Sequence, residues 1–174
     1  MNTMQMQHRH PWRETGRQAL VSGSIASILS TAVLATRGAA EVGSAVAPTN
    51  ATSHWLWGER AYEEYRPTLK HTALGYLTHH ASAIFWAFLL ERALDRRHNP
   101  GTAQIIGSAA ITTALAAFVD YELTPRRLRP GFETHLSRGS LVATFAAIGA
   151  GLAVGALLNR RHERRMEELL TLEE

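Results

Sequence analysis

Residues 139–158 read GSLVATFAAIGAGLAVGALL and contain no aspartate, glutamate, lysine or arginine. A soluble amphipathic helix needs a polar face every three or four residues, so a charge-free run of this length leaves no face for water. At a rise of about 1.5 Å per residue, such a helix spans about 30 Å, which is the thickness of the hydrocarbon core of a bilayer. The stretch therefore predicts a helix that crosses a membrane.

Three further windows, residues 18–36, 72–90 and 102–119, are also free of charge. Together the four windows predict an all-α, four-pass transmembrane helical bundle with a membrane domain over residues 18–158. Residues 1–17 then form a basic cytoplasmic N-terminus, and residues 159–174 form a charged helical tail. The alternative is a soluble four-helix bundle, because the first window is rich in serine and the second contains two histidines.

The averages of the chain hide this pattern. Its 174 residues are 45% hydrophobic and 19% charged, as in many soluble domains, but the charges fall in the connectors and tails. Because there is no cysteine, disulfides, thiolate metal ligands and cysteine nucleophiles are excluded. Nucleic-acid binding is not expected, since the arginines flank apolar spans and do not form a basic stripe with interleaved aromatic residues.

The positions of the basic residues indicate the orientation in the membrane, because lysine and arginine near short loops stay on the cytoplasmic side. The side with the two termini contains ten of them and the other side eight, so both termini are predicted to be cytoplasmic. The ten are Arg9, Arg13, Arg17, Arg92, Arg96, Arg97, Arg160, Arg161, Arg164 and Arg165, and the eight are Arg37, Arg60, Arg66, Lys70, Arg126, Arg127, Arg129 and Arg138.

Two connectors have distinctive sequences. Residues 48–53 are a turn and helix-start signal, and the aromatic stretch HWLWGERAY follows, which predicts a short interfacial helix between spans 1 and 2. This helix is either an aromatic anchor or a lid over a cavity. In the third connector, residues 120–133, we expect Asp120 and Glu122 to pair with the arginines. The alternative is that Arg126, Arg127 and Arg129 bind anionic lipid headgroups.

Small residues recur at four-residue steps in the fourth span: Gly139, Ala143, Ala147, Gly151 and Gly155. In lipid the hydrophobic effect does not drive helices together. Association depends instead on van der Waals packing, which is closest where small residues let two backbones approach. The pattern predicts a helix-packing face. The partner of this face is either a helix of the same chain or a second copy, as a homo-oligomer, and membrane lipid is the other expected partner.

The residues that could support chemistry are His79 and His80 in the second span, with His54 and Asp120 as partners if the fold brings them close. Neighbouring helix residues point about 100° apart, so the two histidines cannot both bind one metal ion. A neutral histidine bonded to a serine or threonine of a neighbouring helix is the expected state. A ligand site or proton path is one alternative, and haem or a divalent metal is the other. No catalytic motif is present, so we expect neither an enzyme nor a cofactor.

Three segments carry a resemblance to known proteins: 50–58 (NATSHWLWG), 75–82 (GYLTHHAS) and 120–133 (DYELTPRRLRPGFE). In these segments the chain resembles a family of small uncharacterised bacterial inner-membrane proteins, over about residues 18–158. The resemblance implies a bacterial inner-membrane location and transfers no activity. The expected role is accessory or structural with helix–helix self-association, and the alternative is a small carrier or a metal- or haem-binding protein using His79 or His80.

Overall fold

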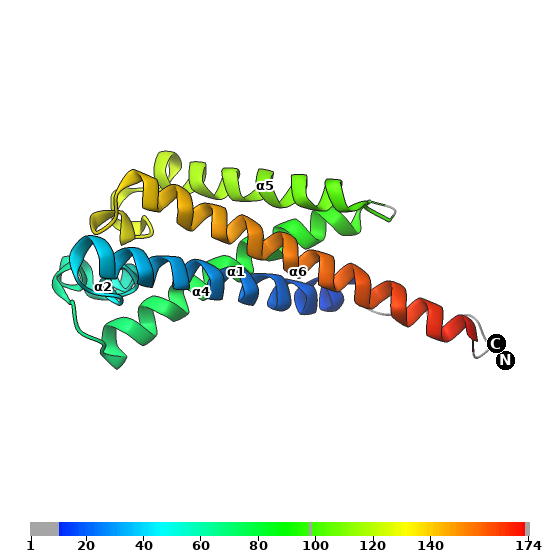
Figure 1. Ribbon diagram of the computed structural model, residues 1–174, viewed down its shortest axis with the longest axis horizontal. Coiled ribbons are helices and arrows are strands. Elements are labelled where there is room, and N and C mark those ends of the chain that lie inside the picture. The colour runs from blue at the N-terminus through cyan, green and yellow to red at the C-terminus, as the bar shows by residue number, and fades with distance from the viewer. Residues whose placement is uncertain (1–10, 98, 173–174) are drawn as a thin grey trace.

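Four long helices form the protein, shown in Figure 1 as a computed structural model that describes residues 11–97 and 99–172. They are α1 (Pro11–Val42), α4 (Leu74–Asp95), α5 (Thr102–Phe118) and α6 (Arg138–Leu172). No strand occurs in the described ranges, so the predicted all-α four-helix bundle is confirmed. Four segments are long and apolar enough to cross a membrane: Trp12–Val42, Leu69–Asp95, Thr102–Leu123 and Arg138–Leu172. The chain thus has the architecture of a small multi-pass membrane protein.

The helices alternate in direction, so the bundle has two distinct ends (Figure 1). We call the end where α1 begins and α6 finishes the terminal end; it also holds the link between α4 and α5. The opposite end, formed by residues 43–73 and 119–137, is the connector end. The start of α1 and the end of α6 therefore lie at the same end of the bundle. Arg9 of the basic N-terminus lies outside the described residues.

α1 lies at the centre of the packing, with α6 and α4 as its main neighbours, and α5 packs chiefly on α6. Glycines make these approaches close. A Cβ added at Gly151 would collide with the Cα of Ala26, and one at Gly155 would collide with the Cα of Ser22. Between α1 and α4, a Cβ on Gly23 would lie 2.6 Å from the Cα of Ile84. Small residues therefore set the helix spacing, as expected where packing and not hydrophobicity joins helices.

Helices α1 and α6 extend beyond the charge-free windows. α1 begins at Pro11, where proline is tolerated because the first N–H groups of a helix have no intrahelical partner. α6 continues from its apolar part to Leu172, and Figure 1 shows its last turns extending past the start of α1. The helical tail is thus continuous with the fourth span, up to the last residues that the structure describes.

The first connector folds into short helical turns: α2 (Ala47–Thr52), α3 (His54–Trp57), η2 (Gly58–Glu63) and η3 (Leu69–Ala73). All six residues of α2 are buried, whereas α3 exposes the side chains of Trp55 and Trp57. The side chain of Asn50 holds the connector together, because its amide donates to the carbonyls of Glu64 and Arg66 at 2.8 and 3.0 Å. The short helix of this connector therefore packs into the bundle end through α2 and exposes aromatic rings through α3.

Candidate functional site

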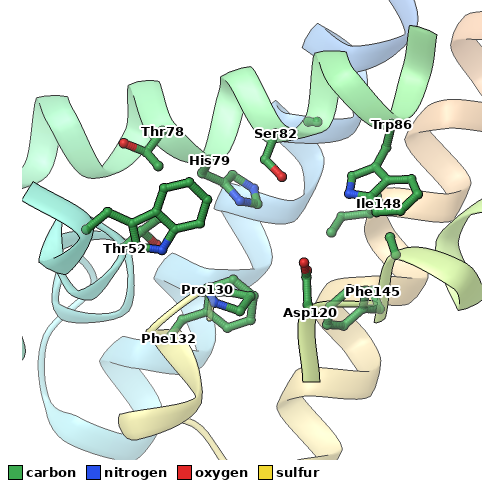
Figure 2. Close-up of a pocket in the computed structure, with 13 residues that line it drawn as sticks. Thr52, Thr78, His79, Ser82, Trp86, Asp120, Pro130, Phe132, Phe145 and Ile148 are labelled. Carbon is green, nitrogen blue, oxygen red and sulfur yellow. The ribbon is translucent and has the colours of Figure 1, made fainter. Parts of the chain in front are cut away.

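A cavity of about 40 Å³ lies at the connector end, between α4 and the two connectors (Figure 2). His79, Ser82 and Trp86 project into it from α4, and Asp120 points toward them from the opposite wall. Most of the remaining wall is aromatic or aliphatic. It is formed by Thr52, Trp55, Thr78, Ala83, Ala116, Pro130, Phe132, Phe145 and Ile148.

Local structure explains why these elements meet. His79, Ser82 and Trp86 are three and four residues apart, which places them on one face of α4. Asp120 lies in η4 (Val119–Leu123), a π-helical turn that follows α5. The third connector approaches the first connector at Gly131, which has φ 93°, a left-handed conformation that favours glycine. A Cβ at this position would lie 2.6 Å from the carbonyl oxygen of Ala51 in the first connector.

The histidine of the cavity is fixed from its far side. The Nε2 atom of His79 lies 2.8 Å from the hydroxyl of Ser30 on α1, and that hydroxyl donates to the carbonyl of Ala26 at 2.8 Å. A serine has only one hydroxyl proton, so we assign the proton on Nε2 to His79, which donates to Ser30. The Nδ1 atom, which makes no hydrogen bond within the described residues, is then an acceptor.

Asp120 does not form the ion pairs expected from the sequence. Within the described ranges no ion pair joins Asp120 or Glu122 to Arg126, Arg127 or Arg129. Arg129 instead donates to the carbonyl of Tyr121 at 2.7 Å, and Arg126 and Arg127 are exposed. Arg126 and Arg127 belong to the short η5 turn (Arg126–Leu128) on the surface. The Asp120 carboxylate therefore faces the cavity without a basic partner in the described chain.

The other two predicted residues lie elsewhere. His80 points toward α1, where its Nδ1 is 2.7 Å from the hydroxyl of Ser27, and its ring stacks on Tyr76 with centroids 5.6 Å apart. His54 is buried in the connector, where its Nδ1 contacts the carbonyl of Ala51 at 2.8 Å. The structure therefore brings two of the four residues together, His79 and Asp120.

Unpaired polar atoms gather around the connector end. Nine buried side-chain nitrogen or oxygen atoms in the described chain have no hydrogen-bond partner, and five of these nine are in residues 52–54 and 121–133. Because buried polar atoms are nearly always satisfied by protein or water, the cluster indicates a hydrated or ligand-binding region. The five atoms are Thr52 Oγ1, His54 Nε2, Tyr121 Oη, Arg129 Nε and Glu133 Oε2.

The described residues do not assemble a metal site. No group of three or more histidine, aspartate or glutamate side chains within 11–97 and 99–172 lies in an arrangement that could hold a metal ion. The cavity is also far smaller than a porphyrin. The arrangement instead offers the Asp120 carboxylate and the Nδ1 of His79 as hydrogen-bond acceptors, with the hydroxyl of Ser82 beside them, among aromatic rings.

A second polar cluster, at the terminal end, was not predicted from the sequence. Glu91 of α4 is fully buried and accepts hydrogen bonds from Ser22 and, at 2.8 Å, from Asn159. Arg160 pairs with Glu91 at 3.1 Å and with Asp95 at 2.9 Å. The available signal was that Glu91 and Asn159 are the first polar residues after two charge-free windows, where α4 and α6 reach the same end of the bundle.

The predicted packing residues of α6 divide into two groups. Gly151 and Gly155 lie against α1 of the same chain, whereas Gly139 and Ala143 are exposed and Ala147 is half-buried. The buried face of α6 instead includes larger residues such as Thr144, Ile148 and Leu152. The small-residue face is therefore partly used within one chain.

Compared with protein-family models, with curated proteins and with solved structures, the chain matches none.

Proposed function

We propose that this protein binds a small cation, of the size of ammonium or methylammonium, between Asp120 and His79, and that it acts as a small membrane carrier. The observation that supports this most directly is the Asp120 carboxylate, which faces an apolar, aromatic-lined cavity with no basic partner in the described chain. A carboxylate in such surroundings is costly unless it is protonated or paired with a cation.

The other groups of the cavity favour the same ligand. The unbonded Nδ1 of His79 and the carboxylate of Asp120 both accept hydrogen bonds, so they select a ligand that donates them. The rings of Trp55 and Trp86 line the cavity, and aromatic faces attract cations electrostatically. A protonated primary amine meets both conditions.

The size of the cavity limits the ligand. The cavity has a volume of about 40 Å³, and one water molecule needs about 10–15 Å³ of such space. The cavity therefore holds a ligand of two or three heavy atoms. Ammonium and methylammonium fit this limit, and tetramethylammonium exceeds it. Thr52 and Trp55 of the first connector form part of the wall, which corresponds to the lid role considered for this segment.

The accessory, self-associating role expected from the sequence is less favoured by the geometry. Its main support was the small-residue face of α6, and Gly151 and Gly155 of that face already contact Ala26 and Ser22 of the same chain. We further propose a bacterial inner-membrane location with both termini in the cytoplasm, which the excess of arginine at the terminal end supports.

Thermal unfolding of the detergent-purified full chain tests cation binding. We expect ammonium and methylammonium chloride to raise the unfolding temperature above that in sodium chloride of equal ionic strength, because a ligand that binds only the folded state stabilises it. Tetramethylammonium should have no such effect. Asp120→Asn should abolish the shift, and the matched control Glu122→Gln, an exposed carboxylate two residues away that does not line the cavity, should retain it.

Two results would overturn the proposal: equal shifts in ammonium and sodium chloride, or an ammonium shift that persists in Asp120→Asn. Since the Asp120 side chain has no ion pair to lose, the asparagine variant should fold. Carrier activity is measured separately, as uptake of radiolabelled methylammonium by proteoliposomes compared with protein-free liposomes and with the Asp120→Asn protein.

A further inference from the structure

A long groove runs along the outer face of the bundle between α5 and α6, with a volume of about 680 Å³. Small side chains form its floor, and they recur at helical spacing on both helices. Ala110, Ala114 and Ala117 contribute from α5, and Ala146, Gly149, Ala150 and Ala153 contribute from α6. This groove shares only Phe145 with the cavity that contains His79 and Asp120.

The two helices are close at the floor of the groove and leave space above it. A Cβ added at Gly149 would lie 3.1 Å from the hydroxyl oxygen of Thr113, so the backbones approach closely at this point. Ala110, Ala114, Ala146 and Ala150 are exposed, because no longer side chain covers them. The groove therefore has apolar walls, and it lies on a face that would contact lipid tails in a membrane.

The groove is polar at one end only. Arg138, the first residue of α6, is the one charged residue among those that line it, and Tyr121 lies at the same end. The Tyr121 hydroxyl is buried and has no hydrogen-bond partner in the described chain, and the Arg138 guanidinium forms no ion pair there. The groove therefore has one cationic side chain, Arg138, without an ion-pair partner in the described chain at its connector end.

We propose that this groove binds an anionic phospholipid, with one acyl chain between α5 and α6 and the phosphate at Arg138. Arginine suits this role because its guanidinium can donate two parallel hydrogen bonds to one phosphate. From Arg138 to Ala153 the groove follows sixteen residues of α6, whose fifteen steps rise by about 22 Å in an α-helix. One leaflet of the hydrocarbon core is about 15 Å thick, so an acyl chain fits along its whole length.

A lipid satisfies the groove better than a helix from a second copy would. An apolar helix lying in the groove would cover the alanines but would leave the Arg138 guanidinium without an anionic partner. Arg126 and Arg127, the headgroup candidates from the sequence, are exposed on the preceding connector and add positive charge at the same end. Arg129 is engaged with the carbonyl of Tyr121, so its contribution is to position that residue.

Native mass spectrometry of the full chain, incubated with equimolar phosphatidylglycerol and phosphatidylcholine, tests this site. We expect phosphatidylglycerol to be retained at least tenfold more than phosphatidylcholine. Both lipids carry a phosphate, but the quaternary ammonium of choline cancels its charge and is repelled by the arginines at this end, whereas phosphatidylglycerol keeps a net negative charge. Arg138→Gln should remove that preference, and Ala146→Leu, which fills the exposed groove, should reduce retention of both lipids. Arg161→Gln, an exposed arginine at the terminal end, is the matched control and should behave as wild type.

Equal retention of the two lipids by the wild type would overturn the proposal, and so would an unchanged phosphatidylglycerol preference in Arg138→Gln. A dimer that retains no lipid and dissociates in Ala146→Leu would assign the groove to a second copy. Because Ala146 and Arg138 are exposed, neither variant disturbs the buried packing.

Discussion

Arg160 of α6 forms an ion pair with Glu91 of α4 at 3.1 Å, in the buried centre of the terminal end. The same guanidinium also pairs with Asp95 and Glu163, at 2.9 and 2.8 Å. Asn159, the residue before it, donates to the carbonyl of Gln18 on α1 at 3.0 Å. One helical turn of α6 therefore fixes the positions of α1 and α4 relative to it.

Loss of Arg160 should destabilise the bundle. Arg160→Met leaves the Glu91 carboxylate buried without its cation, and breaking a buried pair from one side typically costs about 3 kcal/mol. The double variant with Glu91→Gln should recover most of this loss, because neither charge then remains unpaired. Arg161→Met, at the next and exposed position, is the control and should have little effect. Denaturant unfolding in detergent measures the free energy of unfolding of these three variants. Equal stability of Arg160→Met and Arg161→Met would show that the ion pair between Arg160 and Glu91 contributes nothing.

Two glycine substitutions should change stability in opposite directions. Gly151→Ala places a Cβ against the Cα of Ala26, so α6 must move away from α1, which we expect to cost about 1–3 kcal/mol as other overpacked sites do. Gly107→Ala in α5 meets no atom within 4 Å and should stabilise by about 0.5–1 kcal/mol through helix propensity. The same unfolding measurement checks both. An unchanged or raised stability of Gly151→Ala would mean that the close approach at Gly151 does not limit the packing.

The sequence predicted the four helices because the absence of charge is a local property of each window. Their relative rotation depends on pairs of distant residues, which a single sequence does not reveal. The four-residue stripe of α6 shows this limit. Gly151 and Gly155 do face α1, but the stripe drifts from that face toward Gly139, because 3.6 residues per turn do not match a repeat of four.

For the candidate site, too, the sequence predicted individual residues but not how the fold brings them together. His79 and Asp120 were selected as ionisable residues within or beside charge-free windows, which needs only local information. Their convergence depends on α2 being buried and on Gly131 bringing the two connectors together, and both are tertiary features. The expected pairing of Asp120 with nearby arginines failed because proximity in sequence does not fix side-chain direction in a connector that contains two prolines.

The stability of the connector end should fall in mild acid because of His135. Burial lowers the pKa of this histidine in the folded protein, where its Nε2 lies 3.0 Å from the carbonyl oxygen of Tyr62. The unfolded chain, with an ordinary histidine pKa of about 6.5, therefore binds the proton more readily, and stability is lost as the pH falls below that value. Unfolding temperatures between pH 8 and 5 measure this, and His135→Gln should show a shallower fall than wild type. A fall of the same depth in the variant would place the titrating group elsewhere.

Single cysteines should report the orientation without background, because the natural chain has none. Glu59→Cys lies at the connector end and Thr171→Cys at the terminal end, and both positions are exposed. If the arginine excess at the terminal end holds that end in the cytoplasm, a membrane-impermeant maleimide should label Glu59→Cys in intact bacterial cells and Thr171→Cys only after permeabilisation. The reverse pattern would invert the orientation, and labelling of both in intact cells would contradict four spans, since helices that cross a membrane place the two ends on opposite sides.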